Sequence, residues 1–239
     1  MTKLDEFRDR INAVELLRIL KATHSYAQMS KLLALPITVI SRYVNGHVLP
    51  SLRRSKEITR LFSERFLLDA VRSRVRVDES GIFHLSDLVR DAVLQRVIAK
   101  TMSLEFELLR VDKVLTIETN GVPMAVQVAS ELGVDVIIAR KEKEIGVDEF
   151  FEEKCVISPS VNKYFYIPKK SIRADERVLI VDDIIRTSVT LTGLIRLTEQ
   201  ARAKPVGVFA FVLFREARRR LRKHLGATCQ ILSMIEAPS

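Results

Sequence analysis

Short runs of β-branched and aromatic residues alternate with helix-patterned segments in the second half of the chain. This alternation constrains the fold more than any other feature. The runs begin at residues 114, 134, 164, 178, 206 and 229, and they are VLTI, VDVIIA, YFYI, VLIVDD, VGVFAFVLF and CQIL. Strands separated by helices are typical of a mostly parallel sheet that is covered by helices. We therefore predict an α/β domain of about 150 residues.

The first third of the chain predicts helices only. Apolar residues recur at three- and four-residue steps over residues 4–21, which is typical of an amphipathic helix. Its expected buried stripe consists of Leu4, Phe7, Ile11, Val14, Leu17 and Leu20. Two short helices broken at residues 34–36 and a further helical stretch at 51–73 follow. We predict an all-α domain over residues 1–74, an extended connector over 75–85 and the α/β domain over 86–239.

Composition excludes several classes of protein. The chain has 239 residues, 47% of them hydrophobic, and a chain of this length needs neither disulfides nor a structural metal for stability. Cys155 and Cys229 form no CxxC pair and the four histidines are scattered, so a protein-only metal site lacks ligands. The nine-residue apolar run at residues 206–214 is shorter than the roughly 20 residues of a membrane span. We expect a cytosolic protein with no membrane partner.

Positive charge is concentrated in the N-terminal third. Residues 1–78 contain 15 Lys and Arg but 8 Asp and Glu, a net charge of +7, whereas the remaining residues have a net charge of +2. A positive field of this kind attracts polyanions, of which nucleic acid is the commonest. A basic surface that serves only solubility is the alternative.

Residues 26–46 resemble the helix-turn-helix of the phage-repressor and Cro class. The match rests on small Ser30 and Ala34, on apolar Ile40 and on Asn45-Gly46. Two helices that cross at about 90–120° leave room only for small residues at the corner. The pattern therefore indicates a geometry rather than a base sequence, and a helical hairpin that binds no DNA would share it.

The helix-turn-helix resemblance implies that residues 37–44 form a recognition helix that enters the major groove of double-stranded DNA. Arg42 is the best candidate for reading guanine, because its guanidinium can donate two parallel hydrogen bonds to O6 and N7. The predicted DNA-contacting residues are Lys31, Ile37, Thr38, Ser41, Arg42, Asn45, Arg53 and Arg54, with Lys56 as a further phosphate contact.

The segment VLIVDDIIRTSVT at residues 178–190 carries the strongest functional signal. Two carboxylates follow a buried strand, and a polar loop then opens a helix, an arrangement that suits a phosphate. The segment resembles the PRPP-binding motif of type I phosphoribosyltransferases. The resemblance implies that Asp182 and Asp183 bind ribose hydroxyls and that residues 186–190 hold the 5′-phosphate. A solvated acidic turn is the alternative. The implied PRPP-binding residues are Asp182, Asp183, Ile184, Ile185, Arg186, Thr187, Ser188, Val189 and Thr190.

A second segment, VLTIETNGVPMAVQVASELGVDVIIARKEKE, resembles the same family's pyrophosphate loop with its following helix and strand. The implied loop residues are Glu118, Thr119, Asn120, Gly121, Arg140 and Lys141. Arg215 is a candidate for the nucleobase side of the site, and a cation at a helix start explains it equally well. Residues 140–163 are expected to form a long acid-rich loop, either a lid or disordered.

The sequence departs from the family pattern at two places that matter for catalytic turnover. Where the enzymes usually have Thr-Thr-Gly-Gly-Thr, this chain has Arg186-Thr187-Ser188-Val189-Thr190, and a β-branched residue such as Val189 resists positive φ. Arg186 would add positive charge to the phosphate site. The expected lid offers only Lys143, Lys154 and Lys163 as cations among many acids. We expect ligand binding, while the sequence leaves catalysis open.

A DNA-binding head before such a domain resembles the archaeal orotate-phosphoribosyltransferase-like transcriptional regulators and is analogous to the bacterial purine repressor. This resemblance implies an α/β, type I phosphoribosyltransferase fold with an N-terminal helix-turn-helix domain. It also implies a homodimer whose affinity for DNA depends on PRPP, with Mg²⁺ as a suitable companion, or on a related nucleotide. Two alternatives stay open. One is an active Mg²⁺-dependent orotate or purine phosphoribosyltransferase with a DNA-binding appendage, and the other is a domain that only dimerises the heads.

Overall fold

A computed structural model describes residues 2–158 and 161–238, except for the side chains of residues 157, 158 and 188. The chain forms two compact units, one up to Ile98 and the other from Ala99 onward. Helix α7 (Ala92–Phe106) begins in the first unit and ends in the second.

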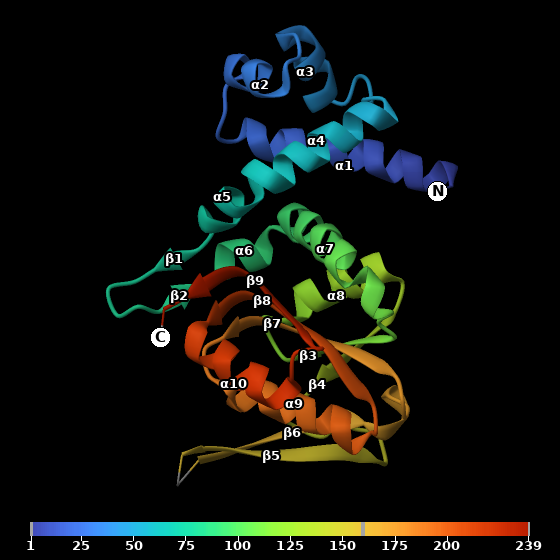
Figure 1. Ribbon diagram of the computed structural model, residues 1–239, viewed down its shortest axis with the longest axis vertical. Coiled ribbons are helices and arrows are strands. Elements are labelled where there is room, and N and C mark those ends of the chain that lie inside the picture. The colour runs from blue at the N-terminus through green and yellow to red at the C-terminus, as the bar shows by residue number, and fades with distance from the viewer. Residues whose placement is uncertain (1, 159–160, 239) are drawn as a thin grey trace. The chain divides into compact units, whose positions relative to one another are not determined.

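The first unit is mainly helical, as the sequence predicts (Figure 1). The predicted break at residues 34–36 separates its second and third helices, so this expectation is confirmed. Residues 75–85 form a small antiparallel hairpin. The elements of the first unit are α1 (Lys3–Lys21), α2 (Tyr26–Leu33), α3 (Ile37–Val44), α4 (Leu52–Arg65), α5 (Leu67–Arg72), β1 (Arg76–Val77), β2 (Phe83–His84), α6 (Ser86–Arg90) and the start of α7.

The buried stripe of α1 differs from the prediction. Leu4, Phe7 and Ile11 are 59%, 51% and 49% exposed, whereas Leu17 and Leu20 are buried as expected. Burial in α1 begins at Asn12, and this 19-residue helix packs against α3 and the 14-residue α4. The first turns hold their helical form through a capping box, in which the Thr2 hydroxyl and the Asp5 carboxylate each accept a backbone N–H of the other residue.

The second unit contains the predicted parallel sheet. Its strands are β3 (Lys113–Ile117), β4 (Asp135–Ala139), β7 (Arg177–Ile185), β8 (Lys204–Phe214) and β9 (Gln230–Ala237), in the spatial order β4-β3-β7-β8-β9. Each neighbouring pair is parallel. Residues 178–182 of β7 and 207–213 of β8 are buried, which explains why these runs are almost continuously apolar. The expectation of an α/β domain with a mostly parallel sheet is confirmed.

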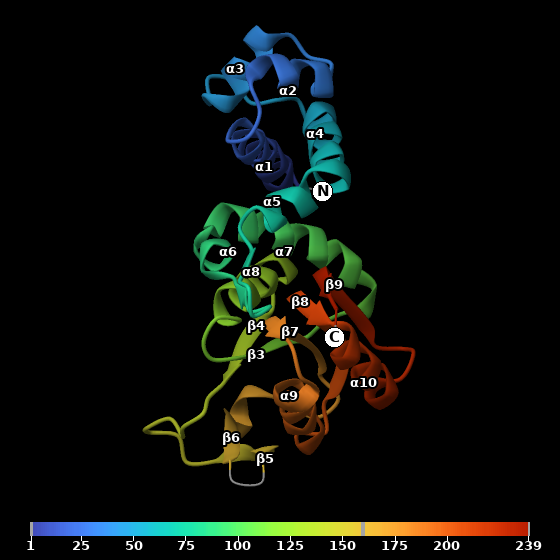
Figure 2. The same cartoon turned by 90° about the vertical axis from the view of Figure 1, so that its left-hand side faces the viewer.

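Helices cover both faces of this sheet (Figure 2). Helix α8 (Val122–Leu132) packs on β3, β4 and β7, while α9 (Ser188–Gln200) and α10 (Arg215–Leu225) contribute to a hydrophobic core on the other face. A short 3-10 helix, η1 (Glu107–Leu109), precedes β3, and another, η2 (Lys169–Ser171), precedes β7. Because all five strands run the same way, their carboxyl ends meet at one edge, where ligands bind in open α/β sheets.

The expected loop at residues 140–163 is in large part a β-hairpin. Strands β5 (Phe150–Ser158) and β6 (Val161–Pro168) pair antiparallel in a sheet of their own, and this sheet includes the YFYI run that we assigned to the main sheet. Cys155 in β5, and Phe165 and Ile167 in β6, are buried in the core with α9, while the residues next to them in the sequence are exposed or only partly buried. The many acids of the segment hide this period-two pattern, so the prediction of a loop was wrong.

None of the described helices is both long and apolar enough to span a bilayer.

Candidate functional site

A cleft of about 400 Å³ lies at the carboxyl ends of β3 and β7. It brings together residues from both phosphoribosyl motifs, which are more than 60 residues apart in the sequence. The lining residues are Ile117, Glu118, Thr119, Asn120, Lys141, Lys163, Phe165, Asp182, Asp183, Ile184 and Thr190. The cleft therefore presents three carboxylates and two ammonium groups to one ligand.

The two adjacent carboxylates differ in environment. Asp182 is only 7% exposed, whereas Asp183 is half-buried. The backbone N–H of Asp183 donates to Asp182 Oδ1 at 2.9 Å. Burial, together with the negative charge of Asp183, raises the pKa of Asp182 well above the ordinary value for a carboxyl. A ligand that donates hydroxyl hydrogens here would oppose this shift, because hydrogen bonds to a carboxylate favour its ionised form.

Gly121 is required by space rather than by backbone conformation. Its φ is −70°, which any residue adopts, but a Cβ atom there would lie 2.7 Å from Thr116 Oγ1 and 2.9 Å from Asp182 Oδ1. The glycine thus lets the start of α8 approach the end of β7. Thr116, which sequence reasoning missed, is fully buried beside both residues.

The predicted pyrophosphate loop is fastened to the end of β4. The Glu118 N–H donates to the Ala139 carbonyl at 3.1 Å, the Glu118 carboxylate accepts the Lys141 N–H at 2.8 Å, and the peptide between Glu118 and Thr119 is cis. Arg140 instead forms an ion pair with Glu144, with 3.4 Å between Nε and Oε2. Of the residues predicted here, Glu118, Thr119, Asn120 and Lys141 line the cleft.

In the predicted phosphate loop, residues 186–190, several side chains point away from the cleft. Arg186 places its guanidinium 5.7 Å from the ring centre of Phe214, and Thr187 is exposed. Val189 lies in the first turn of α9 and packs against the core. Ile185 is buried, and the Ser188 side chain lies outside the described residues. Among the described side chains of residues 185–190, only Thr190 lines the cleft.

Two cleft residues come from the hairpin. Sequence reasoning named Lys163 only as an available cation of the expected loop. It assigned Phe165 to a strand of the main sheet and did not consider it for the site. Helix α9 holds the hairpin in place: Arg196 pairs with Glu153 at 2.9 Å, and a Cβ at Gly193 would lie 2.5 Å from Cys155 Sγ and 2.9 Å from Phe165 Cδ2. The alternation Lys163, Phe165, Ile167 was the signal that could have revealed this.

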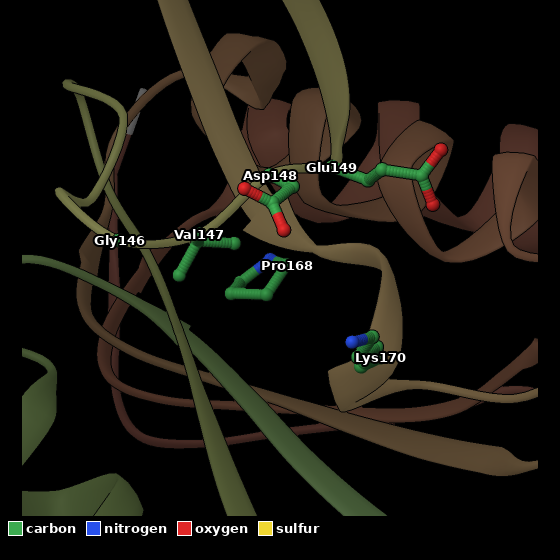
Figure 3. A pocket seen from close by; sticks show the side chains of 6 residues that line it. All are labelled: Gly146, Val147, Asp148, Glu149, Pro168 and Lys170. Atoms are coloured by element: carbon green, nitrogen blue, oxygen red, sulfur yellow. The ribbon is translucent and has the colours of Figure 1, made fainter.

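Two other features lie outside this cleft. Arg215 begins α10 and forms an ion pair with Glu236 at 3.3 Å, which agrees with the structural alternative for this residue. A separate pocket of about 440 Å³ is lined by Gly146, Val147, Asp148, Glu149, Pro168 and Lys170 (Figure 3). None of these six belongs to the predicted site.

The corner between α2 and α3 has an unusual backbone conformation at position 34. Ala34 is left-handed, with φ 51°, which is a conformation that glycine adopts without cost and bulky residues resist. The Ser30 hydroxyl donates to the Leu35 carbonyl at 2.6 Å across the corner. Met29 and Ile40 are fully buried between the helices.

The outer face of α3 and its surroundings are basic. Ile37, Thr38, Arg42 and Asn45 are exposed, and Ser41 is half-buried and accepts a hydrogen bond from the Asn45 amide at 3.2 Å. Residues 16–56 contain seven Lys and Arg and no Asp or Glu. Lys31, Arg53 and Lys56 are exposed, whereas Arg54 is partly covered and pairs with Glu57 at 2.7 Å.

A family model for the phosphoribosyl transferase domain matches residues 90–238. The chain belongs to this family. Among curated proteins it is similar to a xanthine phosphoribosyltransferase of Bacillus cytotoxicus, with 35% identity over 56% of this chain and 70% of that protein. It is also similar to a probable purine biosynthesis transcriptional regulator, PurR, of Streptococcus pneumoniae, with 30% identity over 57% of this chain and 50% of the regulator.

Solved structures agree on the fold. The adenine phosphoribosyltransferase of Thermoanaerobacter pseudethanolicus has a TM-score of 0.62 at 19% identity and covers 71% of this chain and 99% of its own. The enzyme of Saccharomyces cerevisiae gives 0.61 at 21% identity, over 71% of this chain and 98% of its own. The type I phosphoribosyltransferase fold is therefore confirmed for the C-terminal region, and an all-helical region precedes it.

Proposed function

We propose that this phosphoribosyltransferase-domain protein is a DNA-binding transcriptional regulator whose cleft binds PRPP or a related nucleotide as an effector. The proposal rests on the combination of two features in one chain. A basic helix pair free of carboxylates precedes a domain whose two phosphoribosyl motifs line one cleft. In finer terms, the chain would belong with the archaeal orotate-phosphoribosyltransferase-like regulators, and it would act as a homodimer.

The chemistry of the cleft suits a phosphorylated ribose. Asp182 and Asp183 are acceptors for two ribose hydroxyls, while Lys141 and Lys163 supply positive charge for a diphosphate. The 5′-phosphate would lie at the N-terminus of α9, where backbone N–H groups are free of helical partners. The structure of the Trypanosoma brucei adenine phosphoribosyltransferase, a protein with the same fold, contains AMP, pyrophosphate and ribose 5-phosphate, which supports this class of ligand.

The helix pair would hold DNA through α3. Exposed Thr38, Arg42 and Asn45 would face base edges in the major groove, and Lys31, Arg53, Arg54 and Lys56 would bind phosphates. Two heads in a dimer would meet half-sites about 34–36 Å apart, or a multiple of that distance. The similarity to a probable purine regulator supports this half of the proposal.

Fluorescence anisotropy on the upstream DNA of the protein's own gene tests the DNA half directly. At fixed salt, we expect Arg42→Ala to weaken binding to the cognate site by about 1–3 kcal/mol and to relax preference at one base pair. Arg60, an exposed arginine of the same unit that lies 3.9 Å from Glu64, provides the matched control, because Arg60→Ala should change little. An equal loss for Arg42→Ala on random DNA would mean that Arg42 contacts phosphate instead.

Phosphoribosyl transfer is the second candidate function. The similarity to xanthine phosphoribosyltransferases favours it, as does the presence of both motifs in one cleft. It requires Mg²⁺-dependent consumption of PRPP with xanthine, guanine, hypoxanthine, adenine or orotate. Binding of PRPP without product from any of these bases would exclude it, whereas turnover with one of them would establish it.

A further inference from the structure

Thr116, on β3, carries a hydroxyl that the fold does not use. The residue is fully buried, and its Oγ1 has no hydrogen-bond partner among the described residues. A buried polar atom without a partner costs stability, so such atoms are rare in folded proteins and call for an explanation. Valine has the same shape, suits a strand at least as well and would avoid this cost. Threonine at this position therefore has no structural advantage.

The surroundings of the hydroxyl indicate what it can serve. The point where a Cβ of Gly121 would lie is 2.7 Å from Thr116 Oγ1 and 2.9 Å from Asp182 Oδ1. Both oxygens thus flank the same glycine, and each lies where a larger side chain at position 121 would meet it. Asp182 is itself a cleft residue, while Thr116 lies one residue before Ile117, which lines the same cleft.

Asp182 needs hydrogen-bond donors if it is to bind a diol as a carboxylate. Its described partner is the N–H of Asp183, and burial and the Asp183 charge favour its neutral form. Across the sheet, its register partner on β8 is Ala210, which has no charge. The ionisable groups that face it from the cleft are Asp183, Glu118, Lys141 and Lys163. A second donor held close by would stabilise the ionised form.

We propose that Thr116 is a positioning residue of the effector site, whose hydroxyl donates to the Asp182 carboxylate when that carboxylate accepts the ligand's ribose hydroxyls. This inference rests on the proposed binding of a phosphorylated ribose. In the free protein the hydroxyl stays unpaired, at a cost to stability. In the complex it joins a chain of hydrogen bonds from β3 through Asp182 to the ligand. Thr116 touches no ligand atom in this arrangement and acts only through Asp182.

Thr116→Val, made in the 239-residue chain, tests the proposal by calorimetric titration with ribose 5-phosphate. We expect the melting temperature to stay the same or rise, because an unpaired hydroxyl is lost. Affinity for ribose 5-phosphate should fall about tenfold, which is typical of losing a hydrogen bond to a charged group. Affinity for pyrophosphate, which has no hydroxyls for Asp182, should stay the same. Thr116→Ser should restore most of the ribose 5-phosphate affinity.

The pH dependence separates positioning from packing. Binding should weaken as the pH falls through the pKa of Asp182, because the protonated acid accepts fewer hydrogen bonds. Because the Thr116 hydroxyl donates only in the complex, its loss raises the pKa of Asp182 in the complex but not in the free protein. In Thr116→Val the loss of affinity should therefore begin at the same pH and level off at a higher pH. Thr198 provides the matched control: it is equally buried, but its hydroxyl donates to the Leu194 carbonyl at 2.9 Å. Thr198→Val should leave both affinity and pH profile unchanged.

Three results would overturn the proposal: unchanged affinity and pH profile in Thr116→Val, equal losses for ribose 5-phosphate and pyrophosphate, or no recovery in Thr116→Ser. If the valine variant does not fold, a crystal structure of the unmodified protein with ribose 5-phosphate decides. The proposal predicts an Oγ1–Oδ distance of about 3 Å, and an unpaired hydroxyl in that complex contradicts it. Failure of the unmodified protein to bind either probe would instead contradict the proposed function.

Discussion

At the scale of single residues, the site contains two groups that cost stability. Asp182 is a buried carboxyl with a raised pKa, and Thr116 is a buried hydroxyl without a described partner. Both features are unfavourable in a fold that binds nothing. Perturbed groups of this kind cluster at functional sites. The raised pKa has a further consequence: because the folded state holds the Asp182 proton more tightly than the unfolded chain does, this group's contribution to stability diminishes as the pH rises through the raised pKa.

Replacing both carboxylates, Asp182→Asn with Asp183→Asn, separates the two roles. We expect the variant to melt at a temperature equal to or higher than that of the unmodified protein at pH 7.5, since an amide is cheaper to bury than an ionised carboxyl. We expect it to lose the response of DNA binding to PRPP while basal DNA binding remains. Anisotropy with and without PRPP measures this, alongside a melting curve. A response of unchanged size would remove the two carboxylates from the site.

At the scale of elements, the sequence predicts correctly those helices and strands whose hydrophobic pattern has one clear period. The strand that contains Asp182 and Asp183, and the corner at Ala34, follow from the sequence alone. The hairpin at residues 150–168 does not, because its acids lie among apolar residues that alternate only when the segment is viewed as a strand. Leu4, Phe7 and Ile11 mislead in the opposite way, since their helical period is clear but no described helix of the first unit buries them. Thr116 gives no sequence signal, because its significance depends on Gly121 and Asp182 from other elements.

The hairpin and α9 support a prediction at this scale. Gly193→Ala would introduce a methyl group that meets Cys155 and Phe165, so the hairpin would shift and Phe165 and Lys163 would leave their positions in the cleft. We expect destabilisation of about 1–3 kcal/mol, as for overpacking of a core, and weaker binding of PRPP by calorimetry. Gly133→Ala, at a glycine with open space around it but a φ of 69°, is the control, since it should lower stability without affecting PRPP. Wild-type PRPP affinity in Gly193→Ala would show that the hairpin does not position the cleft.

At the scale of the whole molecule, α7 is the segment that joins the two compact units. An effector can change DNA affinity only if it binds the DNA-competent and incompetent states unequally. Within the first unit, two ion pairs hold the start of α7 in place. Arg96 pairs with Glu15 of α1 at 2.6 Å, and Asp91, directly before α7, pairs with Arg74, which follows α5, at 3.0 Å. A movement of α7 would therefore displace α1, and α3 packs on α1.

The proposed division at residue 74 predicts that a fragment of residues 75–239 folds. It loses Arg74 and Glu15, so the partners Asp91 and Arg96 become unpaired, each at a cost of about 1 kcal/mol or less. We expect a dimer in sedimentation experiments that melts a few degrees lower, binds PRPP with the affinity of the full chain and no longer binds DNA. An aggregated or unfolded fragment would argue that the α/β domain is not separable at this point.

The central claim is that occupancy of the cleft alters the grip of the helix pair on DNA. Anisotropy of the unmodified protein on its own upstream DNA, with and without PRPP and Mg²⁺ at one salt concentration, measures this most directly. We predict that saturating PRPP changes the dissociation constant at the cognate site by about 5- to 150-fold, the usual range of allosteric coupling, and leaves binding to random DNA unchanged. The same dissociation constant with and without bound PRPP would contradict the account.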